Sequence, residues 1–118
     1  MTRNPIATAM SEAELMEAVR ALCTDLGLHV FHAADSRRSW GPGFPDLVIV
    51  GRGGCLFAEV KREDGSLSPL QREWQTALQG AGMRWRLWRP SDLLSGQIAK
   101  ELTSLAAVQP ELFAAAAP

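Results

Sequence analysis

The 118-residue sequence is poor in the features that most readily assign a protein to a class. Its two cysteines, Cys23 and Cys55, are too few for a disulfide framework, and no Cys/His cluster has the spacing of zinc ligands. No apolar run approaches the ~18 residues of a membrane span, and residues 1–10 lack the apolar stretch of a secretion signal. These absences indicate a reduced, intracellular compartment.

Neither sign of charge dominates. Twelve Lys and Arg oppose 13 Asp and Glu, and the net charge of -1 argues against a bulk electrostatic binder of nucleic acid. The charge is unevenly distributed, however, because residues 37–89 hold nine basic and five acidic residues, or +4, between flanks of -3 and -2. This segment also holds all four tryptophans. Basic residues interleaved with aromatics are typical of surfaces that bind phosphates and stack bases, although solvated arginines around core tryptophans give the same pattern.

With 47% hydrophobic residues, the chain can bury one core. Capping boxes, apolar periodicity and turn residues predict a series of elements. They are a helix over 11–26, strands over 28–31, 46–50 and 55–61, a helix from 69 to about 80, a strand over 83–88, and a helix from 91 or 92 to about 105. We therefore predict an α/β fold with a mixed sheet of about four strands flanked by helices, in the order α-β-β-β-α-β-α. This single domain would occupy residues 11–106, between a loose leader (1–10) and a frayed Ala-rich tail (107–118).

The second and third strands read as an antiparallel hairpin closed by the turn Gly51–Gly54. Counting back from this turn places Asp46 directly opposite Glu59, at a Cβ separation of about 4.5–5.5 Å, where like charges destabilise a sheet. Glu59 and Lys61 share one face, since side chains alternate along a strand. Two facing carboxylates beside a lysine predict a site for a hard divalent cation such as Mg²⁺. The alternative is a surface ladder of ion pairs.

The hairpin and its surroundings resemble the PD-(D/E)XK nuclease superfamily, and within it the VRR-NUC group. The resemblance is carried by Gly43–Asp46, Phe57–Lys61, Leu67–Gln71 and Trp74, and extends over about 11–92. It implies a restriction-endonuclease-like core and hydrolysis of DNA phosphodiesters with Mg²⁺, or Mn²⁺ in its place. Small stand-alone members come from bacteria and bacteriophages and are similar to Holliday-junction resolvases. The resemblance therefore also implies branched DNA as a partner, a homodimer, and a cytoplasmic location in a bacterium or a phage-infected host.

The same resemblance assigns roles to individual residues. Asp46 and Glu59 would bind the metal, and the backbone carbonyl of Val60 would complete its inner shell. Lys61 would position and activate the attacking water. The family's helix glutamine matches Gln71, which also fits a capping box at the start of its helix.

The family pattern includes a glutamate on the first helix, for which the sequence offers two candidates. Glu12 extends the apolar stripe of Leu15 and Val19 that should face the sheet. Glu14 has a structural role as the capping-box partner of Ser11. We favour Glu12 and leave Glu14 open.

Further residues are candidates for contact with DNA. Arg37, Arg38 and Trp40 precede Asp46 in a Gly/Pro/Ser-rich loop, where they could bind a phosphate and a splayed base. Arg62 and Arg72 lie near the predicted carboxylates in sequence and could contact the backbone. The leading hypothesis is a metal-dependent endonuclease selective for branched DNA or Holliday junctions. The alternatives are a catalytically silent DNA-binding module and a dimerising accessory protein of the same fold. A dimer partner could pack on the apolar side of the last helix or on Trp85 and Trp88.

Overall fold

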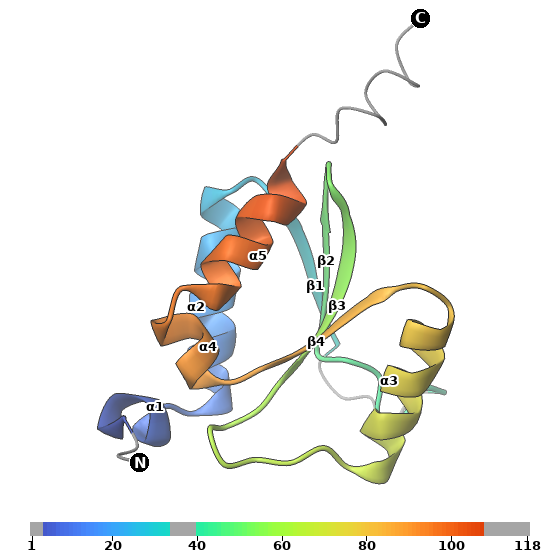
Figure 1. The fold of residues 1–118 in the computed structure, drawn as a ribbon, viewed down its shortest axis with the longest axis horizontal. Helices are drawn as coiled ribbons and strands as arrows, with labels where there is room; N and C mark the ends of the chain where they lie inside the picture. The colour runs from blue at the N-terminus through green and yellow to red at the C-terminus, as the bar shows by residue number, and fades with distance from the viewer. Residues whose placement is uncertain (1–3, 34–39, 108–118) are drawn as a thin grey trace, which may run out of the picture.

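The computed structural model describes residues 4–33 and 40–107. A four-stranded sheet in the order β1-β2-β3-β4 forms its centre (Figure 1). The strands are β1 (His29–His32), β2 (Leu47–Gly51), β3 (Gly54–Val60) and β4 (Arg84–Trp88). The first three are antiparallel, whereas β4 runs parallel to β3. Parallel neighbours need a crossover, which α3 (Pro69–Gly80) supplies. The predicted α/β fold with a mixed sheet of four strands is confirmed.

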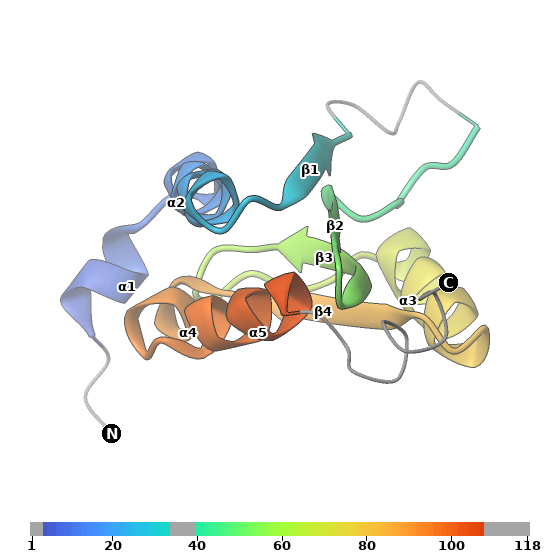
Figure 2. The same cartoon turned by 90° about the horizontal axis from the view of Figure 1, so that it is seen from above.

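Helices cover the two faces of the sheet unequally. The helices besides α3 are α1 (Pro5–Ala9), α2 (Glu12–Asp25), α4 (Pro90–Leu94) and α5 (Gln97–Ala106). Figures 1 and 2 show α2, α4 and α5 on one side of the sheet and α3 on the other, beside β4. The core lies between the sheet and the first group, where α2 and α5 pack on β2 and β3. No residue of α3 is fully buried, so the second face is only partly covered.

Helix α2 has the boundaries that its sequence predicts. The side chain of Ser11 accepts a hydrogen bond from the Glu14 amide at 3.0 Å, and Glu14 in return accepts one from the Ser11 amide at 3.1 Å. Leu15 and Val19 are completely buried against the sheet. The helix ends at Asp25, and Gly27 follows the C-cap residue Leu26 with a φ of 71°, in the left-handed region that glycine adopts without steric cost.

The hairpin has the predicted register. Val50 pairs with Cys55 and Leu47 with Ala58, so the next position would bring Asp46 opposite Glu59. The turn also packs closely on α5: a Cβ on Gly51 would lie 2.5 Å from the carbonyl oxygen of Leu105. The hairpin is therefore fixed at its tip, and the far end of both strands carries the polar residues.

Three predictions about the ends of the chain need correction or addition. The single last helix is wrong, because Gly96, with a φ of 84°, separates α4 from α5. The predicted start of this helix at 91 or 92 is also slightly late, because α4 begins at Pro90. A proline is tolerated at the first helical position, where the backbone N–H has no partner within the helix. The leader contains α1, since Asn4 caps its first turn and Ala7 is buried. The division into leader, domain and tail stays a prediction, and most of the tail lies outside the described residues.

The surfaces first considered for a dimer partner belong to the core of the fold. The apolar side of α5 is buried, and Trp85 and Trp88 are only 6% and 1% exposed. That prediction is wrong, because both surfaces already pack within this chain. In the ranges that the structure describes, no helix is long and apolar enough to cross a membrane.

Candidate active site

Three charged side chains gather where β2 begins and β3 ends. Asp46 immediately precedes β2, Glu59 is the penultimate residue of β3, and Lys61 follows β3. Asp46 Oδ2 accepts a hydrogen bond of 2.8 Å from the backbone amide of Val60. This bond joins the two strand ends and holds the Asp46 carboxylate beside Glu59. The predicted proximity of these two carboxylates is therefore present in the structure.

Glu59 is the one charged side chain that is fully buried within the described residues, at 1% exposure. Its Oε1 accepts a hydrogen bond of 3.1 Å from Gln71 Nε2, and its buried Oε2 has no hydrogen-bond partner in the described structure. A buried carboxylate in its charged form is costly unless cations or donors surround it. The site therefore has an unsatisfied acceptor that a cation could fill.

The pKa of Glu59 reflects this shortage of cations and hydrogen-bond donors around its carboxylate. The pKa of Glu59 is raised to about 9, first by burial and then by the adjacent carboxyl group of Asp46 and the negative charge of Glu12. Lys61 opposes this effect and lowers the pKa of Glu59. A divalent cation at this position would favour the charged carboxylate in the same way as Lys61 but more strongly.

Gln71 connects the site to helix α3. Its Oε1 accepts a hydrogen bond of 2.9 Å from the Ser68 amide and its own amide donates to Ser68 Oγ at 3.2 Å, which completes the capping box. The other end of the same side chain, Nε2, donates to Glu59. Gln71 thus completes the capping box and also contacts Glu59, so the helix start fixes the orientation of a buried carboxylate, while a part for Gln71 in catalysis stays a prediction.

The two candidate glutamates of α2 have different surroundings. Glu14 is engaged in the capping box, and hydrogen bonds from the Ser11 backbone and side chain lower the pKa of its carboxyl. Glu12 is exposed, and its charge contributes to the raised pKa of Glu59. The charge effect of Glu12 on Glu59 and the capping role of Glu14 are consistent with Glu12 as the helix carboxylate of the site, and a part for it in catalysis stays a prediction.

The available donors match a hard cation. No cluster of three or more His, Cys, Asp or Glu residues exists in residues 4–33 and 40–107, so a closed all-protein metal site is not formed there. Mg²⁺ commonly binds one or two carboxylates and takes its remaining ligands from water and substrate phosphates. Asp46 and the partnerless oxygen of Glu59 fit this requirement. The backbone carbonyl of Val60 as a further ligand stays a prediction.

An aromatic contact that the sequence did not reveal holds the segment before Asp46 in place. Trp74 Nε1 donates a hydrogen bond of 3.2 Å to the carbonyl oxygen of Pro42. The ring of Phe44 lies edge-on to Trp74 at a centroid distance of 5.0 Å and to Phe57 at 6.0 Å. We call Pro42, Phe44, Phe57 and Trp74 the aromatic clamp. Phe44, Phe57 and Trp74 all lie in the segments that carry the family resemblance, but the sequence does not indicate that their rings meet.

The residues predicted to contact DNA differ in their exposure and in their contacts. Trp40 is fully exposed at 104%, and Arg62 and Arg72 are also exposed. An Arg62 guanidinium nitrogen lies 3.5 Å from the carbonyl oxygen of Thr8. Arg37 and Arg38 lie outside the described residues. The backbone amide of Lys61 donates to the carbonyl oxygen of Trp88 at 3.1 Å, but its side chain has no hydrogen bond or ion pair with any residue of the described chain, so the ammonium group is available to a ligand.

Comparisons with known proteins agree with this arrangement. A family model described as the VRR-NUC domain matches residues 4–91. A solved structure described as a VRR-NUC domain is 22% identical, with a TM-score of 0.61 over 75% of this chain and 96% of its own. Another, described as a VRR-NUC domain protein, is 18% identical, with a TM-score of 0.62 over 86% of this chain and 94% of its own. At these identities the two structures show a common fold. No curated protein matches the sequence.

Proposed function

The chain belongs to the VRR-NUC domain family, and from this premise we propose that it is a metal-dependent endonuclease that hydrolyses phosphodiester bonds in DNA. The observation that carries the proposal is the pair of adjacent carboxylates, one of them buried with a partnerless oxygen. A protein that only bound DNA would gain nothing from two such acids beside the phosphates. A metal site, in contrast, requires such acids, because a bound cation stabilises the two adjacent carboxylates in their charged forms.

In this proposal the residues of the site have different roles. Asp46, Glu59 and the Val60 carbonyl would hold Mg²⁺ or Mn²⁺, with Glu12 as an additional carboxylate nearby. When bound, the ion would lower the pKa of a water ligand and offset charge on the phosphate oxygens. Gln71 orients Glu59 through the 3.1 Å hydrogen bond. Lys61 favours the charged form of Glu59, and its free ammonium group can hold the attacking water and the developing phosphorane charge.

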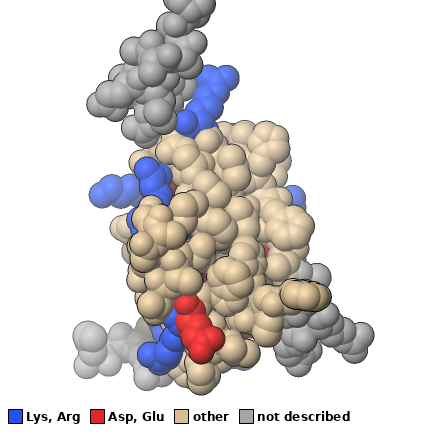
Figure 3. Space-filling model, turned by 90° about the vertical axis from the view of Figure 1, so that its right-hand side faces the viewer, with Lys and Arg blue, Asp and Glu red and all other residues tan. Residues whose placement is uncertain are grey.

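We further propose that the substrate is branched DNA, such as a Holliday junction, and that the active form is a cytoplasmic homodimer. Cutting two strands of a junction requires two active sites, which a two-fold dimer provides. The second sheet face is a suitable surface, because Phe31 and Val50 are 63% and 44% exposed on it. Figure 3, viewed from the side of α3, shows few charged side chains on this part of the molecule, most of them towards its margins.

A cleavage assay tests the proposal. The protein is incubated with a four-way junction, a flap and a linear duplex, in Mg²⁺ or in EDTA. We expect Mg²⁺-dependent cutting that is fastest on the junction and falls by a factor of roughly 10³ or more in Glu59→Ala and Lys61→Ala. Glu73→Ala, which removes an exposed acid from α3, serves as the matched control.

Three outcomes would contradict the proposal. Undiminished cutting by Glu59→Ala or by Lys61→Ala would exclude this site as the catalytic centre. Binding of DNA without cutting on any substrate would support the catalytically silent DNA-binding module. Absence of DNA affinity even at low salt would support the accessory protein instead.

A further inference from the structure

A cationic region lies between β4 and α5, away from the carboxylates of the candidate active site. It is an open pocket of about 430 Å³ whose polar lining consists of Arg84, Arg86, Gln97, Lys100, Glu101 and Ser104. Arg84 and Arg86 pair with Leu56 and Ala58 and therefore point to the face of the sheet that α5 covers. Glu59 points to the opposite face. The pocket is thus separate from the candidate active site.

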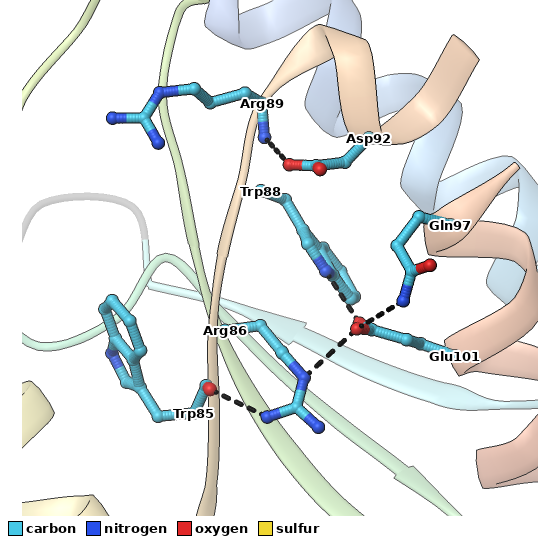
Figure 4. A network of polar contacts seen from close by, with 7 residues as sticks. All are labelled: Trp85, Arg86, Trp88, Arg89, Asp92, Gln97 and Glu101. Carbon is cyan, nitrogen blue, oxygen red and sulfur yellow. Dashed lines mark hydrogen bonds and ion pairs between the residues drawn. The ribbon is translucent and has the colours of Figure 1, made fainter. Parts of the chain in front are cut away.

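Arg86 is held in this pocket by a partly buried network of hydrogen bonds, drawn in Figure 4. Glu101 Oε2 accepts a hydrogen bond of 2.9 Å from Trp88 Nε1, while its Oε1 accepts from Arg86 Nε at 3.2 Å and from Gln97 Nε2 at 3.1 Å. Arg86 Nη1 donates to the carbonyl oxygen of Trp85 at 3.0 Å. The guanidinium group is therefore fixed in orientation, with Nη2 left for another acceptor.

The pocket also holds positive charge that nothing in the described chain balances. Glu101 is its only acid, and three donors already satisfy that carboxylate. The side chains of Arg84 and Lys100 are exposed and make no hydrogen bond or ion pair with the described residues. A fixed guanidinium that shares a pocket with two unpaired cationic side chains suits a tetrahedral oxyanion, because arginine presents several donors in one plane to phosphate oxygens.

We propose that this cationic pocket binds a backbone phosphate of the DNA substrate, distinct from the phosphate that is cleaved. The inference rests on the proposed function. Arg84 is level with Leu56 on β3, three residues from Glu59, so the pocket lies about 10 Å along the strand from the carboxylates and on the other face of the sheet. A contact there engages a different part of the DNA, such as a second arm of a branched molecule, and adds affinity without taking part in chemistry.

Binding in EDTA tests the pocket separately from cleavage. Fluorescence anisotropy with a labelled duplex and a labelled four-way junction is measured for Arg84→Ala, Lys100→Ala and the double variant, from 50 to 200 mM salt. We expect each single variant to weaken binding about 3- to 10-fold and the slope of log K against log salt to fall by ~0.9 for each lost phosphate contact. The matched control is Arg20→Ala, since Arg20 is an exposed arginine already paired with Glu17.

The indole of Trp88 provides a local probe, because its N–H donates to the same carboxylate that holds Arg86. Addition of duplex DNA should shift the Trp88 indole signal in a ¹H–¹⁵N spectrum of the wild type and leave it unmoved in the double variant. Inorganic phosphate, tested in parallel, should shift the same signal and compete with DNA. A response to phosphate without a response to DNA would identify a site for a small phosphorylated ligand and overturn the proposal.

Loss of affinity no greater than in Arg20→Ala would also overturn it. The two proposals fail in distinguishable ways. If the protein cuts DNA while Arg84→Ala and Lys100→Ala bind it normally, only the pocket inference is wrong. If the pocket variants lose DNA affinity while wild type cuts no substrate, the nuclease proposal is wrong and the phosphate site stands. Unfolding temperatures close to that of the wild type would show that these exposed substitutions leave the fold intact.

Discussion

The Glu59 side chain is buried beside another carboxylate, two conditions that disfavour a charged acid, and it accepts only one hydrogen bond, from Gln71, that would favour the charged form. The neighbouring Lys61 compensates only in part. Groups with such strongly shifted pKa values concentrate at functional sites, because chemistry requires charge in places where stability alone would remove it. Glu59 should therefore reduce the stability of the metal-free protein at the pH values where the site is active.

The first prediction concerns the pH dependence of this effect. The folded-state pKa of Glu59 is about 9, against an ordinary value of 4.5. Between these values the folded state binds more protons than the unfolded state, so stability falls as pH rises. In EDTA, Glu59→Gln should raise the unfolding temperature at pH 8 by roughly 5 °C, and the gain should shrink towards pH 4.5. Thermal unfolding from pH 4.5 to 9 measures this difference, with Glu73→Gln as the control. Parallel curves for the two variants would contradict it.

The second prediction separates the two contacts of Gln71. Gln71→Glu keeps an acceptor for the Ser68 amide, since glutamate also completes a capping box, but it replaces the donor to Glu59 by a like charge. Helix stability should stay near that of the wild type, while Mg²⁺-dependent cleavage falls by about 10- to 100-fold, the equivalent of a hydrogen bond to a charged group. Circular dichroism and single-turnover cleavage measure the two effects. Gln79→Glu on the exposed side of α3 is the control, and equal activity of both variants would exclude a role for Gln71 in positioning Glu59.

At the scale of helices and strands, the sequence predicts the features that depend on residues close together in the chain. The capping boxes of Ser11 and Ser68 and the register of the hairpin are all local, and all are confirmed. The proximity of Asp46 and Glu59 follows directly from that register. The sequence does not predict the separation of α4 from α5, because Gly96 is an isolated glycine in an otherwise helical pattern and a helix can tolerate one such residue. The Gln71–Glu59 bond and the aromatic clamp join distant segments, so no local pattern could predict their geometry.

The third prediction concerns the aromatic clamp, which connects the segment ending in Asp46 to the helix that carries Gln71. Trp74→Phe keeps an aromatic ring but removes the hydrogen bond to Pro42. We expect a loss of about 0.5–1.5 kcal/mol in the free energy of unfolding and a decrease in kcat that exceeds any rise in KM, because the position of Asp46 becomes less defined. Urea unfolding and steady-state cleavage test this, and Trp40→Phe, at a fully exposed indole, controls for stability. Unchanged kcat together with reduced stability would make the clamp purely structural.

At the scale of the whole molecule, polar chemistry and apolar surface occupy different regions. The carboxylates lie at one end of the sheet, and the cationic pocket lies between β4 and α5. The β1–β2 half of the second face is largely apolar, exposes Phe31 and Val50, and is covered by no helix of the described chain. Contiguous apolar surface of this kind marks interaction sites. A second copy of the chain is a suitable occupant, because an apolar face with few charged side chains can meet itself with little like-charge repulsion.

The last prediction therefore concerns assembly. In the proposed two-fold dimer, Phe31→Glu would place two negative charges against each other across the interface and should convert that dimer to a monomer, as measured by sedimentation equilibrium. If the two active sites act together on a junction, the monomer should still nick DNA but should lose the coupled cutting of both strands, which a cruciform plasmid distinguishes as nicked rather than linear product. Leu94→Glu alters an equally apolar, 44% exposed side chain on α4 and should leave the dimer intact. A wild-type protein that is monomeric at micromolar concentration, or a dimer that Phe31→Glu does not weaken, would exclude this face as the interface and leave the nuclease site itself unaffected.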